Sequence, residues 1–304
     1  GIFQMARQVL AHGRKFEIVH ANSQKAFIVA AVARWMGSPP VVWHLRDILT
    51  ASHFSYTNRF IVVQLANRFA ARVIVNSEAT GEAFVKSGGN SALVKVVYNG
   101  ISAAKFTQSN SIDRNGLRES LKIPQKAQIV GCFSRLSYWK GQHVLLKAVE
   151  NFPNIHVLLV GLALFGEEEY VKYLKDIVRE SGLSNRVHWL GFRDDIPSLM
   201  LACDIIAHTS TEPEPFGRVI VEGQLSKRAV IATNAGGARE IISDGITGKL
   251  IPINDPNALS KAIKDLVSQP DMLIKLGANG FEAAQVRFSL ERHIKNFDKA
   301  IGEI

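Results

Sequence analysis

Cysteine is scarce in this sequence of 304 residues, which contains only two, Cys132 and Cys203. Both lie in apolar segments, and their spacing is not that of metal ligands. This pattern favours two buried free thiols in a reducing cytosol over a disulfide scaffold. We therefore expect a cytoplasmic protein.

Long apolar runs and two nucleotide-binding motifs are also missing. No run reaches the roughly 18 residues that a membrane-spanning helix needs, and the apolar stretch at 26–33, ended by Arg34, is typical of a buried helix. No G-x-G-x-x-G follows a predicted strand and no G-x-x-x-x-G-K-[ST] occurs, which argues against an NAD-dependent dehydrogenase and a phosphate-loop ATPase.

The charge balance is basic, with a formal net charge of +9. Such a balance indicates an anionic partner, either a phosphate-rich substrate or an anionic membrane surface touched peripherally from the cytoplasmic side. A solvated basic face is an equally good interpretation. No basic stripe interleaved with aromatic residues is present, so we expect no nucleic-acid partner. The first third carries a basic bias: Arg7, Arg14, Lys15, Arg34, Arg46, Arg59, Arg68 and Arg72.

Short runs of Val, Ile and Leu alternate with longer amphipathic segments along most of the chain. This alternation predicts an α/β fold with parallel sheets covered by helices on both faces. Four predicted strands precede a polar stretch and six follow it. They lie at 16–20, 41–44, 73–76, 94–98, 128–134, 156–160, 187–190, 205–208, 229–233 and 249–251.

The stretch 102–112 is small and polar without a period, and we interpret it as an interdomain linker. We expect a partial N-terminal domain over 1–106, a second domain over 107–286, and a C-terminal helix over 287–304 that packs back on the first domain. Four strands are few for a complete doubly wound domain, and Gly1 opens inside a predicted helix. The natural start is therefore expected upstream.

Three segments that follow predicted strands could bind a ligand. Arg135 and Lys140 come after the strand at 128–134, where two cations could hold a diphosphate. Gly236 and Gly237 follow the strand at 229–233 and precede a helix, which would let backbone amides approach an anion. Either feature could also be structural, as exposed surface cations or as a tight turn.

The third segment runs from Glu214 to Glu222, after the strand at 205–208. Two prolines stiffen its start as an extended loop, and a helix is expected from Gly217 to Leu225. Both carboxylates can then face one cleft and accept hydrogen bonds from vicinal hydroxyls of a sugar or ribose. The alternative is a capped helix with solvated glutamates.

Together these motifs resemble glycosyltransferase family 4, which has the GT-B fold of two Rossmann-like domains facing a cleft. Glu-Pro-Phe-Gly with a second Glu after seven intervening residues is similar to the family's signature. Further matches fall in the family's order. They are Arg135…Lys140-Gly141, Val160-Gly161, Leu190-Gly191-Phe192-Arg193-Asp194-Asp195, Gly236-Gly237…Glu240 and Asp244-Gly245-Ile246-Thr247-Gly248.

The resemblance implies a role for each matching residue. Arg135 and Lys140 would bind the donor diphosphate, with Gly236 and Gly237 nearby, and Glu222 would hold the ribose hydroxyls. The backbone of Phe216, Gly217, Arg218 and Val219 would cradle sugar and phosphate, and Phe192 and Arg193 would lie near the base. Glu214 would contact the transferred sugar as a catalytic residue.

His44 ends a segment that resembles the family's strand with an active-site histidine, which implies a second catalytic residue near the acceptor. The implied activity is a retaining hexosyltransferase that moves a sugar from a nucleotide-diphosphate sugar to a sugar or lipid-linked acceptor in cell-envelope polysaccharide, lipopolysaccharide or glycolipid synthesis. No Asp-x-Asp occurs, so neither a metal nor another cofactor is expected. The alternatives are a non-catalytic nucleotide-sugar-binding subunit and a GT-B sugar epimerase or phosphorylase.

Overall fold

The computed structural model describes residues 1–50, 54–107, 113–164 and 166–304, which form two compact units. Unit 1 comprises residues 1–100 and 290–304, and unit 2 comprises residues 101–289. The divisions at Gly100 and Ser289 differ slightly from the sequence-based boundaries at 106 and 286. The expected linker contains a short helix, α5 (Ala104–Thr107), and its residues 108–112 lie outside the described part.

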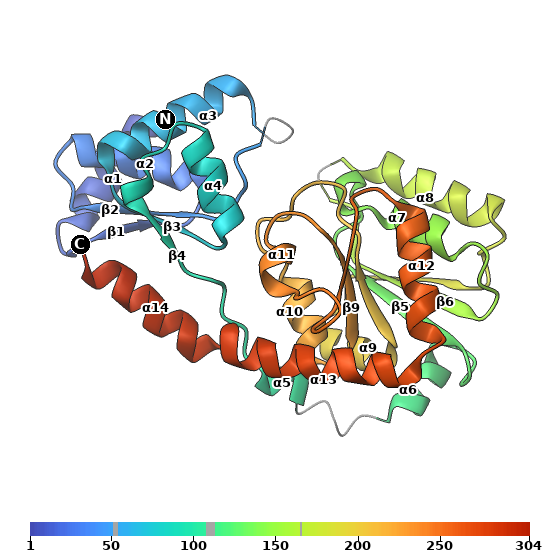
Figure 1. The fold of residues 1–304 in the computed structure, drawn as a ribbon. Helices are drawn as coiled ribbons and strands as arrows, with labels where there is room; N and C mark the ends of the chain where they lie inside the picture. The colour runs from blue at the N-terminus through green and yellow to red at the C-terminus, as the bar shows by residue number, and fades with distance from the viewer. Residues whose placement is uncertain (51–53, 108–112, 165) are drawn as a thin grey trace. The chain divides into compact units, whose positions relative to one another are not determined.

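Unit 1 is built on a parallel sheet of four strands in the order β1-β2-β3-β4 (Figure 1). The strands are β1 (Val19–Ala21), β2 (Val41–Leu45), β3 (Ala70–Val75) and β4 (Val94–Val96). The helical elements are α1 (Ile2–Gly13), α2 (Gln24–Trp35), α3 (Tyr56–Phe69), α4 (Glu78–Lys86), the 3₁₀ turn η1 (Ser91–Leu93) and α14 (Leu290–Gly302).

Alternation along β2 sorts its side chains between two layers. Trp43 is fully buried and stacks on Phe27 of α2, with ring centroids 4.5 Å apart, on the face that α2, α3 and α4 cover. Val42 points to the opposite face, where it packs with Ala300 of α14. Because successive strand residues point to opposite faces, His44 shares the α14 face with Val42.

Unit 2 contains a parallel sheet of six strands in the order β10-β9-β8-β5-β6-β7. The strands are β5 (Gln128–Phe133), β6 (Ile155–Val160), β7 (Val187–Gly191), β8 (Ile205–His208), β9 (Ala229–Thr233) and β10 (Lys249–Ile251). The helical elements are α5, α6 (Arg114–Ser120), the 3₁₀ turn η3 (Tyr138–Lys140), α7 (Gln142–Val149), α8 (Glu168–Glu180), α9 (Ile196–Ala202), α10 (Arg218–Leu225), α11 (Ala238–Ile241), α12 (Pro256–Val267) and α13 (Pro270–Arg287).

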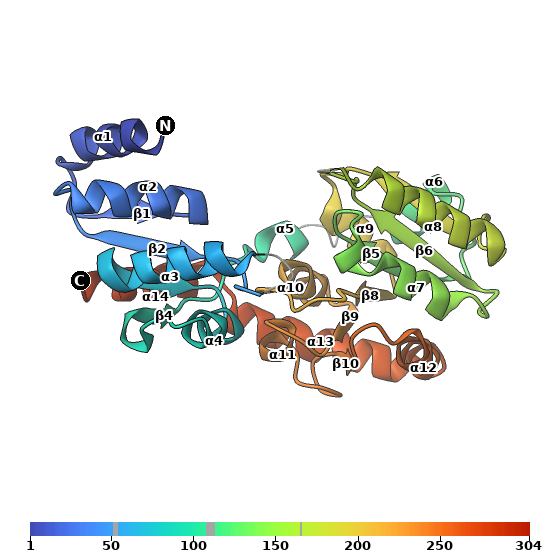
Figure 2. The ribbon, with the colours of Figure 1, turned by 90° about the horizontal axis from the view of Figure 1, so that it is seen from above.

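Helices cover both faces of this sheet, as the mostly apolar sequences of its central strands require. The cores of α7, α8 and α12 pack on one face, and Figure 2 shows α7 and α8 alongside β5 and β6. On the other face Gly223 brings α10 close to Ile206 and Val230, where a Cβ atom would approach both side chains within 3.1 Å. The expected α/β architecture with parallel sheets is confirmed.

Strand order in unit 2 reverses between β5 and β8. The chain runs outward through β5, β6 and β7, and then returns to the other side of β5 with β8, β9 and β10. In open α/β sheets a ligand crevice forms outside the carboxyl ends of the strands at such a reversal. Within the described ranges, no helix has the length and apolar character that crossing a bilayer requires.

Candidate functional site

The loops that leave β5 and β8 meet at the strand reversal, where two hydrogen bonds to backbone carbonyls hold them together. Thr209 Oγ1 donates to the carbonyl of Lys140 at 3.1 Å, and the amide of Thr211 donates to the carbonyl of Trp139 at 2.7 Å. The reversal therefore places residues far apart in sequence at one edge of the sheet.

Gly141 makes this approach possible. Its φ is +69°, a left-handed conformation that favours glycine, and a Cβ atom there would overlap the carbonyl oxygen of Thr209. Gly141 also precedes α7, whose buried Gln142 donates to the carbonyl of Arg135 at 2.7 Å and to Ser134 Oγ at 2.9 Å. The loop carrying Arg135 and Lys140 is thus fixed from both sides.

The Glu214 carboxylate lies at the centre of this edge. Its Oε2 atom accepts a hydrogen bond from Lys140 Nζ at 2.5 Å, from Ser210 Oγ at 3.2 Å and from His208 Nε2 at 3.2 Å. The side chains of Lys140 and Glu214 are only 14% and 15% exposed, so this is a largely buried ion pair. All three contacts use Oε2, and Oε1 accepts no hydrogen bond from the described residues.

Electrostatics at this edge favour an ionised Glu214. Burial by itself would raise the pKa of the carboxyl group, but the hydrogen bond from His208 and the charge of Lys140 outweigh it and lower the pKa below its ordinary value. Lys140 Nζ also lies 3.8 Å from the centroid of the Trp139 ring, a cation–π contact that holds the ammonium group.

Glu222 is the second expected carboxylate, and it lies on the helix that follows the loop of Glu214. It lies on α10 with a side chain 17% exposed, and its ion pair with the exposed Arg218 measures 3.4 Å. Burial raises the pKa of Glu222, because the charge of Arg218 offsets the loss of water only in part. Of the two expected carboxylates, Glu214 is therefore firmly ion-paired and Glu222 only loosely.

The Gly236-Gly237 turn packs against the backbone of the loop that contains Glu214. The amide of Gly237 donates to the carbonyl of Glu214 at 2.8 Å, and a Cβ atom at Gly237 would lie 2.6 Å from the Cα atom of Phe216. These glycines thus join two loops, and the approach of their amides to an anion stays a prediction. The following helix α11 is a single turn.

The start of α10 explains the Phe216-Gly217 pair. Gly217 is the N-cap residue with φ +101°, which a residue other than glycine rarely adopts. Phe216 is buried and contacts the ring of Phe288 edge-on at 5.6 Å. The side chain of Phe216 therefore anchors the loop. The backbone of Phe216, Arg218 and Val219 is the part that could contact a ligand.

Phe192 and Arg193 follow β7, at the same edge of the sheet as the other loops. The Phe192 side chain is 76% exposed, an unusually open position for an aromatic ring. Arg193 forms a bidentate pair with Asp195 at 2.7 and 2.6 Å. An open ring beside a held guanidinium is compatible with the predicted contact to a base.

His44 is enclosed within unit 1. Its side chain is 1% exposed, stacks on His20 with centroids 5.5 Å apart, and lies 6.0 Å from the ring of Phe297 on α14. Burial and the charge of Arg46 lower its pKa to about 3, so the ring is neutral at physiological pH. This geometry does not expose the ring to a substrate, and the catalytic role assigned from sequence stays a prediction. The exposed polar groups at the end of β2 are Arg46 and Asp47.

Three residues around the Lys140–Glu214 pair were not predicted from sequence. They are His208 and Ser210, which donate to Glu214, and Trp139, which contacts Lys140. The signal for His208 and Ser210 was their position at the end of β8, directly before the proline-containing loop. Among the described residues, no three His, Cys, Asp or Glu side chains are grouped so that they could hold a metal ion.

Comparison with known proteins gives two family matches that together cover most of the chain. Residues 113–283 match the model for "Glycosyl transferases group 1", and residues 2–100 match the model for "Glycosyl transferase 4-like domain". The first match covers nearly all of unit 2, including every loop of the site described above.

Several relatives of known structure or name are similar over long stretches. The crystal structure of Anabaena Alr3699/HepE in complex with UDP-glucose is 40% identical, with a TM-score of 0.93 over 98% of this chain and 82% of that chain. "D-inositol 3-phosphate glycosyltransferase" of Corynebacterium urealyticum is 30% identical over 93% of this chain and 70% of its own length. "Lipopolysaccharide core biosynthesis glycosyltransferase LpsE" of Rhizobium meliloti is 30% identical over 57% of this chain and 49% of its own length.

Proposed function

Because this chain belongs to the glycosyl transferases group 1 family and has the GT-B fold, we propose that it transfers a hexose from a UDP-sugar, in the first place UDP-glucose, to a hydroxyl group of a sugar or lipid-linked acceptor. The choice of donor is supported by the Anabaena relative, whose structures contain UDP and UDP-glucose. The acceptor class is supported by relatives named for lipopolysaccharide core synthesis.

The observation that carries the proposal is the Lys140–Glu214 pair at the strand reversal. A lysine ammonium group has three N–H donors, and Glu214 accepts from one of them. Lys140 can therefore join the sugar-binding carboxylate to a donor phosphate, with Arg135 as the second cation. The Oε1 atom of Glu214 is then the acceptor for a hydroxyl group of the transferred sugar.

We propose the remaining donor contacts from the positions of the other loops. Glu222 would accept hydrogen bonds from the two ribose hydroxyls, which can compensate for the burial of its carboxylate. The backbone of Gly217, Arg218 and Val219 would face the sugar and phosphate, and the exposed ring of Phe192 would stack on the base with Arg193 beside it. Gly236 and Gly237 would act by holding the loop of Glu214 and Phe216.

We propose that transfer retains the anomeric configuration. Glu214 is held by Lys140, His208 and Ser210, so the carboxylate is poorly suited to attack the anomeric carbon as a nucleophile. The acceptor would instead attack from the face of the departing phosphate, which takes the acceptor proton. The contribution of Arg135 and Lys140 is to stabilise the negative charge that develops on the leaving diphosphate.

This mechanism uses no metal ion and no histidine base. Charge on the diphosphate is neutralised by Arg135 and Lys140, so we propose that activity persists in a chelator. We further propose a cytoplasmic enzyme with peripheral contact to an anionic membrane surface, which the basic residues of the first third support. Loss of activity in a chelator that returns with a divalent metal would contradict the first point.

Two alternatives make different predictions for the same assay. A non-catalytic nucleotide-sugar-binding subunit would bind the donor without turnover, and a sugar epimerase or phosphorylase would act without an acceptor alcohol. Hydrolysis of UDP-glucose is measured by proton NMR, which also reports the anomer first released. The proposal predicts slow release of α-glucose. Release of β-glucose would contradict retention, and binding without any turnover in the presence of acceptors would favour the subunit.

The donor itself is tested by a thermal-shift panel of UDP-, GDP- and ADP-sugars. A ligand that binds only the folded state raises the unfolding temperature according to its concentration relative to its dissociation constant. We expect the largest shift with UDP-glucose, and a larger shift with a GDP- or ADP-sugar would refute the choice of nucleotide.

A further inference from the structure

A cavity lies in unit 2 at the amino ends of the strands, on the edge of the sheet opposite the loops of the donor site. Its volume is about 400 Å³. Its polar lining comes from Arg114 of α6, Gln128 at the start of β5, Asp204 before β8, and the Lys227-Arg228 pair that precedes β9. The site described above uses none of these residues.

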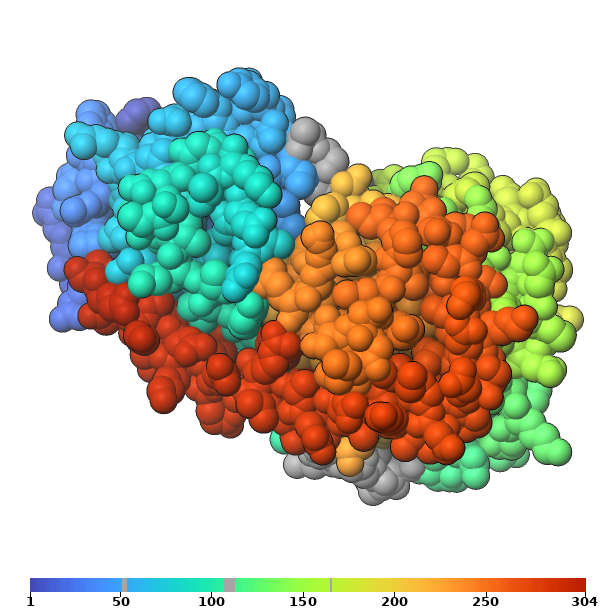
Figure 3. Space-filling model, viewed as in Figure 1, coloured from blue at the N-terminus to red at the C-terminus, as the bar shows by residue number. Residues whose placement is uncertain are grey.

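One wall of this cavity is apolar. Val267 at the end of α12 and Leu273 and Ile274 of α13 contribute to the lining. The Ile274 side chain is 70% exposed. These helices belong to the orange-to-red surface in Figure 3. The cavity thus combines a basic end with an apolar wall.

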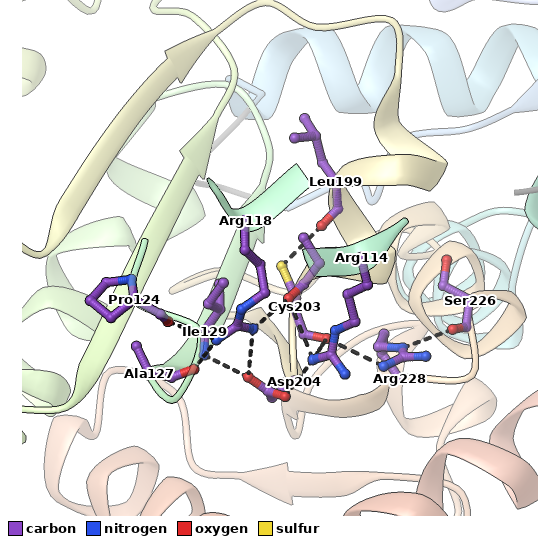
Figure 4. Close-up of polar contacts among 11 residues, drawn as sticks. Arg114, Arg118, Pro124, Ala127, Ile129, Leu199, Cys203, Asp204, Ser226 and Arg228 are labelled. Carbon is purple, nitrogen blue, oxygen red and sulfur yellow. Dashed lines mark hydrogen bonds and ion pairs between the residues drawn. The ribbon is translucent and has the colours of Figure 1, made fainter. Parts of the chain in front are cut away.

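Positive charge exceeds negative charge around the basic end. Among the described lining residues, Asp204 is the one acidic side chain, against Arg114, Lys227 and Arg228. Asp204 is already occupied by contacts that Figure 4 shows. Its Oδ1 accepts from Arg114 at 2.5 Å, and its Oδ2 accepts from the amide of Ile129 at 2.8 Å.

The arginine behind this pair has a structural role. Arg118 is buried, and its guanidinium group donates to the carbonyls of Ala202, Pro124 and Ala127 and lies 3.6 Å from Asp204 Oδ2. Arg118 therefore holds the loop before β5 through its bonds to Pro124 and Ala127. It also adds a positive charge near Asp204. One carboxylate cannot balance this group of cations.

Arg228 is held differently, with part of its guanidinium group left unused. Its Nε donates to the carbonyl of Ser226 at 2.9 Å, and Nη1 reaches the carbonyl of Cys203 only at 3.5 Å. Nη2 donates to no atom of the described residues. Burial and the nearby charge of Arg114 lower the pKa of Arg228, so a bound anion would relieve an unfavourable positive potential.

We propose that this cavity binds an organic phosphate, with its phosphate group between Arg114, Lys227 and Arg228 and its apolar part against Val267 and Ile274. Arginine guanidinium groups are well suited to phosphate because they donate in a planar fork, and lysine adds a point charge. An apolar substituent on the phosphate would displace water from the α13 wall and strengthen binding.

Two cavity variants and two controls test the proposal by calorimetry on the full chain, with inorganic phosphate and butyl phosphate as probes. Arg228→Gln removes the fork, and Lys227→Asn removes a charge at a residue whose φ of +53° asparagine tolerates well. Arg179→Gln changes an exposed arginine of α8. Lys140→Ala removes a cation of the donor site and therefore reports phosphate bound there.

We expect butyl phosphate to bind the unmodified chain about tenfold more tightly than inorganic phosphate, because roughly two methylene groups become buried. Arg228→Gln should weaken binding of both probes about tenfold or more, and Lys227→Asn several-fold. Arg179→Gln and Lys140→Ala should leave the cavity's affinity unchanged.

Three results would overturn the proposal. They are the absence of saturable binding, equal affinity in the two cavity variants and the unmodified chain, and a loss of binding confined to Lys140→Ala. An unfolding temperature of Lys227→Asn equal to that of the unmodified chain shows that a loss of binding is not a loss of fold. Failure of this test would not contradict the proposed donor site, since the two sites share no residue.

Discussion

Replacing Glu214 with glutamine perturbs the centre of the site while keeping its shape. The substitution leaves Lys140 largely buried beside a neutral amide, where an ion pair of 2.5 Å existed before. Removing one partner of a buried pair costs about 3–5 kcal/mol, because the other charge stays desolvated. Glutamine still offers an oxygen to Lys140, so we expect a loss of about 2–3 kcal/mol in the free energy of unfolding of unit 2.

The size of this loss should depend on pH. The folded-state pKa of Glu214 lies below its ordinary value of 4.5, so the ionised carboxylate stabilises the fold fully above the unfolded pKa. As pH falls below about 4.5, Glu214 binds a proton in the unfolded state but stays ionised in the folded state. The difference between the unmodified chain and Glu214→Gln should therefore be largest near neutral pH and shrink below pH 4.

Differential scanning calorimetry measures both effects. A domain of this size shifts by roughly 2–4 °C per kcal/mol, so the transition of unit 2 should fall by about 4–12 °C at pH 7. Glu169→Gln is the matched control, because its ion pair with Lys172 is 85% and 74% exposed and should contribute almost nothing. An unchanged transition in Glu214→Gln, or a difference that grows as pH falls, would refute the reasoning.

Three further results follow from individual residues. Gly141→Ala should destabilise unit 2 by about 3 kcal/mol or more in urea denaturation, because the new methyl group would overlap the carbonyl of Thr209; a loss below about 1 kcal/mol would be incompatible with the structure. Cys132 should resist thiol reagents at pH 8 until the chain unfolds, because burial raises its pKa to about 11, and rapid reaction of the folded chain would disprove this. His44 should show no imidazole titration by NMR between pH 8 and 5, and unit 1 should lose stability as pH falls from 6.5 towards 3, since the unfolded state then binds a proton that the folded state does not. A titration midpoint near pH 6.5 would contradict its burial.

The strands of unit 2 could be predicted closely from sequence because they are short, apolar and bounded by polar turns. The first residues of the strands were harder to predict in unit 1. The strand expected at 16–20 begins only at Val19, since Phe16 is 66% exposed and the pairing with β2 starts later. The strand expected at 73–76 begins at Ala70, because α3 runs into β3 without any turn residue between them.

The contacts of the site could be predicted only in part. Sequence placed Lys140 and Glu214 after two different strands and assigned them to different parts of the donor, and the ion pair between them depends on the strand order. Local sequence does not show that β8 lies beside β5. The enclosure of His44 could not be predicted for a related reason, because the alternation of β2 does not tell which face α14 will cover.

The central claim is that a UDP-hexose binds at the carboxyl ends of β5 and β8. Calorimetric titration with UDP-glucose tests it most directly, comparing the unmodified chain with Lys140→Ala, Glu222→Gln and the exposed control Lys175→Ala of α8. The account predicts that both site variants bind about 10–100-fold more weakly, through the loss of charged hydrogen bonds, and that the control binds as before. Equal affinity in all four proteins, or no binding of UDP-glucose to the unmodified chain, would contradict it.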